Sequence, residues 1–405
     1  MAGQLGTQDP RETRVLREGF TTGSAATGAA LAALRLLLDG ERLTEVAVPL
    51  PPFDSEGQPR GWRTLPIAHC ATGVAPCEEQ NPPAAADKAA TALADGPAVA
   101  HATIIKDGGD DPDVTNGLPV VVSVTLYAGT PTARPEIALH GGPGVGRVTL
   151  PGLPVPVGEV AINPVPREQI RRAIWLWLGR NHALCPPLRV TVSVPGGEAV
   201  AGKTFNPRLG IVGGISILGT QGTVRPYSHD AFKATIAQGL QVAHTMHCDC
   251  VCLTTGRRSE KLLMALFPAL AAHAFVQVAD FAQFALHTAG EYGFGRIVWG
   301  CFFGKLIKLA QGLPNTHAHE AVTDMRLLAS LCREHGLGSS CVEAMAQVTT
   351  AAHALELVLG EAGGMAVITA LARRVAGVAS QFAGQEVRVY LFHTDGRLLC
   401  GPVGA

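Results

Sequence analysis

The sequence lacks the features that mark a nucleic-acid-binding protein or a membrane protein. Phe, Trp and Tyr make up 5% of its 405 residues, so there are few aromatic platforms on which single-stranded nucleic acids could stack. The formal net charge is −1, and no overall field attracts DNA or an acidic lipid surface. The longest apolar stretch, AALAALRLLLDG, is interrupted by Arg35 and is too short to cross a bilayer. We therefore expect no nucleic-acid partner and no membrane span.

Cysteine usage indicates neither a disulfide framework nor a metal site. The ten cysteines are spread unevenly, without the dense spacing of small secreted domains, and no signal peptide precedes them. One cluster suggests zinc, namely His247, Cys248, Cys250 and Cys252. Residues two apart on a straight strand, however, lie ~6.5 Å from one another, which is wide for a tetrahedral zinc site. We expect buried free cysteines, no protein metal site and a cytoplasmic location.

Glycine is the residue in excess, with 47 copies in the chain against a usual level of about 7%. Glycine permits positive φ and a close approach of the backbone to a ligand, so the excess predicts functional loops. The length is too great for one ordinary core. We expect an N-terminal domain over 1–200 and a C-terminal domain over 201–405, with the boundary between 165 and 205.

The first half of the chain predicts an α+β domain with a mixed or antiparallel sheet. A helix should be capped by Thr21 or Thr22, run through an alanine- and leucine-rich stretch, and stop at Gly40. Prolines exclude a regular central strand or helix interior between 149 and 166, and the next helix is expected to start at Pro166. Strands are expected at 44–51, 101–106, 118–127, 136–140 and from 188.

The second half alternates strands and helices, which predicts an α/β domain with a Rossmann-like parallel sheet. Strands are expected at 250–255, 274–279 and 296–300, each followed by a helical stretch, after a first helix over 229–244. Three helices are expected between 318 and 383. The chain should close with a hairpin that turns at Asp395 and Gly396.

Several long and unusual loops follow one another in a specific order. IIKDGGDDPDVTNG, GGPGVGRVTLPGLPVPVGEVAINPVPR, GKTFNPRLGIVGGISILGTQGTVRPYS, LTTGRRSE and GKLIKLAQGLPNTH together resemble the signatures of the cobalt-precorrin-5B (C-1)-methyltransferases. The opening GFTTGSAATGAA is similar to the N-terminal motif of that family. The chain departs from the family where a histidine commonly precedes GK. Cys301, Phe302 and Phe303 occupy that place, so no catalytic histidine is expected there.

The resemblance implies methylation of ring carbon C-1 of cobalt-precorrin-5B, to give cobalt-precorrin-6A, in anaerobic cobalamin (vitamin B12) biosynthesis. It also implies S-adenosyl-L-methionine as the methyl donor, cobalt that is carried by the substrate only, and loss of a two-carbon fragment from the tetrapyrrole. Two other functions stay open, a non-catalytic tetrapyrrole carrier and a phosphate-handling enzyme that uses GGPGVG. GGPGVG is not followed by the GK[ST] that ends a P-loop, which counts against the second. A homo-oligomer is compatible with the sequence.

A tetrapyrrole with many acetate and propionate groups needs cationic side chains and backbone N–H groups spread over a wide surface. Cations in glycine- or proline-rich settings or near helix starts meet this need, although each could also be a solvated surface residue. Threonines before the first helix could hold a carboxylate or only cap the helix. The residues expected to bind the substrate are Thr21, Thr22, Ser24, Lys106, Arg147, Lys203, Arg208, Arg225, Arg257, Arg258 and Lys305.

Catalytic and donor-binding residues are expected in three short segments. The acidic loop after the strand at 101–106 offers Asp107 and Asp110 as bases for a carbon-bound proton and Asp111 for the ribose of the donor. The alternative is a solvated turn. GGPGVG offers Gly142, Gly144 and Gly146 for the donor, but no helix is expected after it, so an ordinary dinucleotide loop is excluded and a structural turn stays open. His317 is expected to move a proton or contact the substrate, unless it is a hydrogen-bonded structural histidine.

Overall fold

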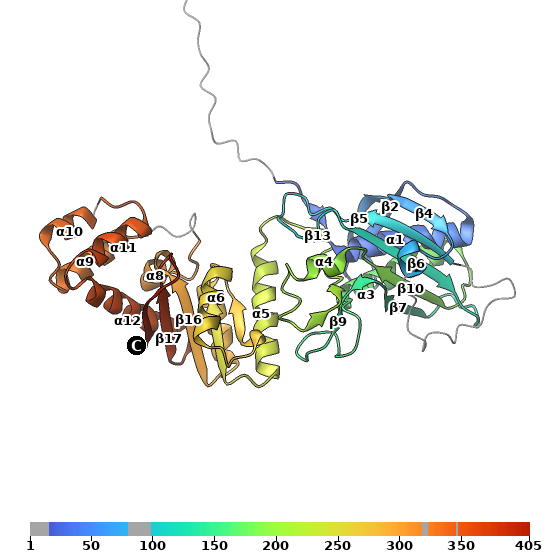
Figure 1. The fold of residues 1–405 in the computed structure, drawn as a ribbon. Coiled ribbons are helices and arrows are strands. Elements are labelled where there is room, and N and C mark those ends of the chain that lie inside the picture. The colour runs from blue at the N-terminus through green and yellow to red at the C-terminus, as the bar shows by residue number, and fades with distance from the viewer. Residues whose placement is uncertain (1–15, 80–98, 318–322, 346) are drawn as a thin grey trace, which may run out of the picture. The chain divides into compact units, whose positions relative to one another are not determined.

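The computed structural model describes residues 16–79, 99–317, 323–345 and 347–405, and the chain divides into two compact units (Figure 1). The first unit consists of Met1–Thr149 and Pro154–Ser228, and the second of Leu150–Leu153 and His229–Ala405. The division at Ser228 comes later than the predicted range of 165 to 205. The reason is that the long loop after 202 pairs with strands of the first unit, as described below.

Helix α1 (Thr22–Asp39) is the centre of the first unit. The side chain of Thr21 accepts a hydrogen bond from the Ser24 amide at 3.2 Å, and Gly40 ends the helix in the left-handed region at φ 69°. Both predicted ends are thus confirmed. Residues on every side of the helix, such as Ala26, Leu31 and Ala32, are buried. A helix that is apolar all round must be enclosed, and α1 packs against the sheet, helix α3 and strand β2.

A five-stranded sheet of order β4-β5-β6-β10-β7 covers α1. All neighbours are antiparallel except β10 and β7, so the predicted mixed sheet is confirmed. Ala102, Val122 and Val190 face the core from three successive strands. The strands are β4 (His69–Thr72), β5 (Val99–Ile105), β6 (Pro119–Leu126), β7 (Ile137–Gly141) and β10 (Leu188–Ser193).

A separate hairpin and three further helices belong to the described part of this unit. Strands β2 (Glu45–Phe53) and β3 (Pro59–Pro66) pair antiparallel, and α2 (Pro76–Glu79) and α4 (Gly197–Ala201) are short. Helix α3 (Pro164–Asn181) starts two residues before the predicted Pro166. Asn163 takes the extended N-cap conformation, so Pro164 occupies the first turn, where a missing N–H costs nothing.

The glycine-rich loops of the first unit are joined by two-residue strands. These are β1 (Gly19–Phe20) with β13 (Thr223–Val224), β8 (Gly144–Val145) with β12 (Gly214–Ile215), and β9 (Arg147–Val148) with β11 (Ile211–Val212). Gly144 has φ 77°, and a Cβ on it would lie 1.9 Å from the carbonyl oxygen of Val194. Backbone therefore packs on backbone here, which only glycine allows.

Replacing Gly144 by alanine is expected to lower the free energy of unfolding by about 3 kcal/mol or more, because it adds a clash to an unfavourable φ. Gly158→Ala is the matched control, since Gly158 also has positive φ but has open space around its Cβ position. That variant should lose only about 1–2 kcal/mol. Urea denaturation of both variants measures the difference, and equal losses would contradict the assigned packing.

The second unit has a five-stranded sheet of order β15-β14-β16-β17-β18. The first four strands are parallel and β18 is antiparallel to β17. The strands are β14 (Cys250–Thr254), β15 (Phe275–Gln277), β16 (Arg296–Phe302), β17 (Val387–Phe392) and β18 (Leu398–Val403). The predicted parallel strands and the predicted closing hairpin are confirmed.

Helices cover both faces of this sheet. Leu263 of α6 (Arg257–Leu266) packs with Cys250 and Cys252 on one face. Val251 and Leu253 point to the other face. That face is covered by α5 (His229–Thr245), α7 (Ala282–Glu291), α8 (Phe303–Ala310) and α12 (Gly364–Ala383), and a 3-10 turn, η2 (Ala272–Ala274), precedes β15.

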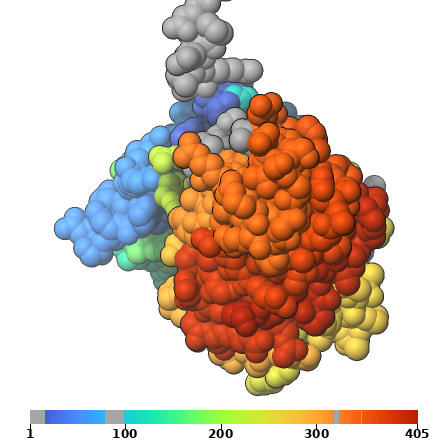
Figure 2. Space-filling model, turned by 90° about the vertical axis from the view of Figure 1, so that its left-hand side faces the viewer, coloured from blue at the N-terminus to red at the C-terminus, as the bar shows by residue number. Residues whose placement is uncertain are grey.

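Four helices, where three were predicted, lie between 323 and 383 in the described part of the chain. They are α9 (Met325–Glu334), α10 (Ser339–Met345), α11 (Ala351–Leu359) and α12. Gly336, with φ 73°, separates the first two, because it ends α9 in the left-handed region. Figure 2 looks onto the side of the second unit where orange and red side chains from this part of the chain pack into a continuous surface.

Candidate functional site

The acidic loop of the first unit is tied to the N-terminal segment by Arg17. The guanidinium of Arg17 donates to both carboxylate oxygens of Asp107, and its backbone N–H donates to Asp110 at 2.8 Å. Asp111 accepts from the backbone N–H of Tyr227 at 3.0 Å. These donors offset the repulsion between neighbouring carboxylates. Segments 17–20, 107–111 and 224–227 therefore form one cluster, which we call the acidic-loop cluster.

The electrostatics of Asp107 suit an anchor better than a base. The Arg17 guanidinium beside it, helped by the Gly109 amide, lowers the pKa of Asp107 below its usual value. A general base works best with a pKa near the working pH. The geometry thus favours a structural role for Asp107, and its predicted role in proton transfer has no support from this arrangement.

Lys106 is buried beneath the same loop, with 2% of its side chain exposed. Its Nζ lies 2.7 Å from Asp113, which also accepts from the hydroxyl of Thr115 at 2.7 Å. Burial alone would raise the pKa of Asp113, but Lys106 and the hydrogen bonds outweigh burial and lower this pKa. Because Lys106 is enclosed and paired, it stabilises the loop from inside, where a substrate carboxylate would not reach it without a rearrangement.

The three hydroxyl residues at the start of α1 hold the loop 216–222. Thr22 accepts from the Leu218 amide at 2.9 Å, and Ser24 donates to the Gly222 carbonyl at 2.8 Å. Gln169 of α3 donates to Ser24 at 3.0 Å. Thr21, Thr22 and Ser24 are buried and form hydrogen bonds with protein groups. Their role in holding the fold together therefore accounts for these residues without a ligand.

Several cations at the acidic-loop cluster were not found by the sequence analysis. Arg63 donates to the carbonyl oxygens of Gly19 and Glu18, and Arg60 donates to Gln221. Arg225, which was predicted, pairs with Glu18 at 3.1 Å and is 62% exposed. Arg60 and Arg63 lie on a strand without any recognisable motif, so only the folded hairpin brings them here. Apolar side chains of this region are also exposed, namely Leu16, Leu218 and Tyr227.

The glycine-rich segment 141–147 lies beside the loop 211–217 of the same unit. A Cβ on Gly146 would lie 2.5 Å from Ile211, and one on Gly142 would lie 2.1 Å from the Ser193 hydroxyl. These contacts, like those of Gly144, explain the glycines without a ligand. Arg147 donates to the Gly158 carbonyl. Of the other predicted cations, Lys203 is exposed and Arg208 is half-buried.

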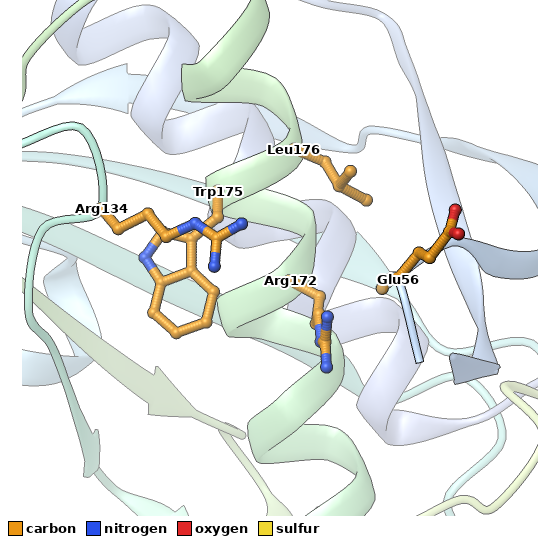
Figure 3. Close-up of a pocket in the computed structure, with 6 residues that line it drawn as sticks. Glu56, Arg134, Arg172, Trp175 and Leu176 are labelled. Carbon is orange, nitrogen blue, oxygen red and sulfur yellow. The ribbon is translucent and has the colours of Figure 1, made fainter. Parts of the chain in front are cut away.

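A pocket of about 180 Å³ lies between helix α3 and the tip of the β2–β3 hairpin. Figure 3 shows side chains from both elements around it. Its lining is Glu56, Gly57, Arg134, Arg172, Trp175 and Leu176. None of the predicted site residues lines this pocket.

In the second unit, loops at the carboxyl ends of the parallel strands carry the remaining predicted residues. Strand β14 leads through Thr255 and Gly256 into α6, whose first residues are Arg257 and Arg258. Arg258 donates to the Thr394 carbonyl and lies over the ring of Phe302 at 5.3 Å. Both arginines are exposed. The chain leaves β14 towards one face of the sheet and leaves β16 towards the other.

Strands β15 and β16 bring two charged residues together at this edge. Asp280, three residues after β15, pairs with Lys305 in the first turn of α8. The hydroxyl of Thr316 donates to the same Asp280 oxygen at 3.1 Å, and the Thr316 amide donates to the Asp280 carbonyl at 2.9 Å. The backbone N–H of His317 donates to Asn315 at 2.9 Å. Asp280 and Thr316 were missed, because neither has a sequence signal apart from its place after a strand or beside the NTH motif.

The cysteines of β14 behave as buried core residues. Cys250 and Cys252 share the face that packs against Leu263, and a hydrogen bond with the Cys250 thiol, together with burial, raises the pKa of Cys252. Within the described ranges, no group of three or more His, Cys, Asp and Glu side chains is placed to hold a metal ion. Nor does any described helix have the length and apolar character needed to span a bilayer.

Comparison with known proteins identifies the family. The family model CbiD matches residues 9–73 and 82–226, and the model for the CbiD C-terminal domain matches residues 315–401. The chain belongs to the CbiD family. These matches include the acidic loop, the glycine-rich loops and His317, while the segment from 227 to 314, with β14, β16 and Lys305, lies between them.

Several relatives that share one name match most of the chain. A cobalt-precorrin-5B C(1)-methyltransferase of Nitratidesulfovibrio vulgaris is 48% identical over 97% of this chain and 95% of its own length. Proteins with the same name from Geobacillus kaustophilus and Leptospira borgpetersenii are 41% and 36% identical over 86% and 96% of this chain, and over 84% and 95% of their own lengths. A crystal structure of a cobalamin biosynthesis protein (cbiD) from Archaeoglobus fulgidus is 26% identical, covers 71% of this chain and 78% of that chain, and has a TM-score of 0.34.

Proposed function

We propose that this CbiD-family methyltransferase transfers a methyl group from S-adenosyl-L-methionine to ring carbon C-1 of cobalt-precorrin-5B in cobalamin biosynthesis. The observation that carries the proposal is the 48% identity to a protein of that name over nearly the full length of both chains. The donor is inferred from the reaction class, and the tetrapyrrole from the name of the relatives. Cobalt belongs to the substrate.

The donor is assigned to the carboxyl edge of the second unit's sheet. Strand β15 pairs with one edge of β14, and the next strand, β16, pairs with the other edge. The loops after β14 and β16 lead to helices on opposite faces of the sheet. Such switch points are where open α/β sheets bind nucleosides. We infer a Rossmann-like donor site here, bordered by Gly256 after β14 and by Lys305 after β16, in preference to the glycine loop at 142–146.

Asp280 is the residue we assign to the ribose of the donor. An acidic side chain after the strand that follows the first helix binds ribose hydroxyls in folds of this kind, and Asp280 follows β15 in the same way. Lys305 and Thr316 both contact its Oδ1. Among the described residues Oδ2 has no hydrogen-bond partner, so this oxygen can accept from a hydroxyl.

The acidic-loop cluster and its cations are assigned to the tetrapyrrole. Arg17, Arg60 and Arg225 are exposed and held by single carboxylates or amides, and exposed ion pairs of this kind contribute only about 0–1 kcal/mol. Substrate carboxylates can therefore replace these partners at little cost. The exposed side chains of Leu218 and Tyr227 supply apolar contact for the ring.

The main task of the protein in this reaction is to align the methyl donor with the C-1 carbon. The C-1 carbon attacks the methyl carbon as the carbon–sulfur bond breaks, and S-adenosylhomocysteine leaves as a neutral thioether. Holding the two carbons in line at about 3–3.5 Å can supply up to ~7–11 kcal/mol of the barrier reduction. No covalent intermediate with the protein is needed. Among the predicted catalytic residues, His317 remains our candidate for proton transfer on the tetrapyrrole.

Methyl transfer tests the proposal directly. The protein is incubated with cobalt-precorrin-5B and donor labelled in its methyl group, and the label in the tetrapyrrole is measured. We expect one label per tetrapyrrole, located at C-1. A spectral change on binding without any labelled product would identify a carrier and overturn the proposed activity.

Charge reversal at Arg225 is expected to raise the KM for the tetrapyrrole about tenfold, with a smaller change in kcat, because a substrate carboxylate loses a charged partner. Arg225→Glu should fold normally, since the side chain is 62% exposed. Arg180→Glu, at the exposed end of α3, is the control for the change in charge. An equal KM in the two variants would contradict the placement of the substrate at the acidic-loop cluster.

A further inference from the structure

Lys305 spans the carboxyl end of strand β14. Its helix follows β16, whereas its partner Asp280 follows β15, and these two strands flank β14 on either side. The ion pair thus connects the loops on both sides of the switch point. Only 28% of the Lys305 side chain and 20% of the Asp280 side chain are exposed, so the pair is shielded from solvent more than an ordinary surface pair.

The same lysine also holds the turn that carries the NTH motif. The Thr316 carbonyl accepts from Lys305 at 3.4 Å and from Lys308 at 3.1 Å. The Thr316 side chain and amide in turn bind Asp280, and Thr316 is 1% exposed. Loss of the Lys305 ammonium would therefore remove the charged donor to Asp280 and one of the two lysine contacts to the turn, while Lys308 and the Thr316 bonds to Asp280 would remain.

The surroundings of Lys305 make its charge sensitive to pH in an accessible range. Two charged groups act on it, Asp280 from the loop after β15 and Lys308 from its own helix. Burial, with a contribution from Lys308, lowers the pKa of Lys305 to about 8. The Asp280 carboxylate acts in the opposite direction, because a paired negative charge favours the protonated lysine. With a pKa of about 8, the lysine is protonated below that pH and loses its charge as the pH rises through it, whereas an unperturbed lysine keeps its charge to about pH 10.

We propose that Lys305 is a positioning residue that orients Asp280 for the ribose of the methyl donor and so makes donor affinity depend on the protonation of Lys305. This inference rests on the proposed function. Lys305 and Thr316 hold Asp280 through Oδ1, so Oδ2 is left to accept from a ribose hydroxyl. When Lys305 is neutral, the carboxylate loses its charged partner and keeps only the Thr316 hydroxyl on Oδ1, so its orientation is held less firmly.

The test is the Kd of S-adenosylhomocysteine for the full chain, measured by calorimetry between pH 6.5 and 9.5. For the wild type we expect constant affinity at low pH and a loss of about tenfold above pH 8. Lys305→Met should bind about tenfold more weakly at pH 7 and show no such pH dependence. Lys308→Met removes a neighbouring positive charge that contributes to the lowered pKa of Lys305, so it should move the midpoint to higher pH. Lys261→Met, on the exposed side of α6, should behave as the wild type.

The outcomes separate the inference from the function on which it rests. Wild-type protein that fails to bind S-adenosylhomocysteine at pH 7 overturns the donor site and the inference with it. Binding with a flat pH profile, or a Lys305→Met profile that matches the wild type, overturns the inference and leaves the donor site intact. A merely structural lysine would lower the melting temperature of Lys305→Met without moving the midpoint in Lys308→Met.

Discussion

Replacing Lys106 by methionine is expected to lower the free energy of unfolding of the first unit by about 2–4 kcal/mol. The substitution keeps the apolar stem but leaves Asp113 under the acidic loop without the ammonium that lies 2.7 Å from it. Removing one partner of a buried ion pair costs about 3–5 kcal/mol, and the 22% exposure of Asp113 reduces this figure.

A double substitution separates the lost charge from the lost packing. Lys106→Met with Asp113→Asn should recover part of the stability, because the remaining buried group is then neutral. Urea denaturation measures the loss, and hydrogen exchange of residues 106–118 assigns it to this loop. A loss below about 0.5 kcal/mol in the single variant, within the range of ordinary surface substitutions, would show that the pair does not hold the loop.

Asp280→Asn is expected to weaken S-adenosylhomocysteine binding by about 10- to 150-fold. The change removes a charged acceptor for a ribose hydroxyl, and hydrogen bonds to charged groups contribute about 1.5–3 kcal/mol. It also leaves Lys305 without its carboxylate partner. Calorimetric titration measures the Kd, and circular dichroism establishes that the variant is folded.

Asp249→Asn is the matched control for this experiment. Asp249 directly precedes β14 and lies at the amino edge of the sheet, where it pairs with Arg296 at 3.4 Å with 74% of its side chain exposed. Its neutralisation should leave the Kd unchanged. If Asp280→Asn binds within twofold of the wild type, the ribose does not contact Asp280 and the donor site must be placed elsewhere.

The sequence by itself determined the order of the acidic and glycine-rich loops, and with this order the family. It also determined the local elements whose ends have side-chain or glycine signals, such as α1 between Thr21 and Gly40. Alternation of polar and apolar residues predicted most strands, because one or both faces must be buried. Where two prolines compete for a helix start, as at Pro164 and Pro166, local pattern was ambiguous and the start shifted by two residues.

Only the tertiary structure decided which candidate groups already bind other groups of the protein. Thr22, Ser24 and Lys106 have the chemistry of ligand-binding residues, but their partners lie 7 to 198 positions away in the chain. Gly144 is explained by the approach of Val194, and Asp280 gains its importance from Lys305 across β14. Such pairings depend on strand order and long-range contacts, which no local sequence pattern encodes. A polar side chain can form the same hydrogen bonds with a protein partner as with a ligand, so its residue type does not show which of the two it binds.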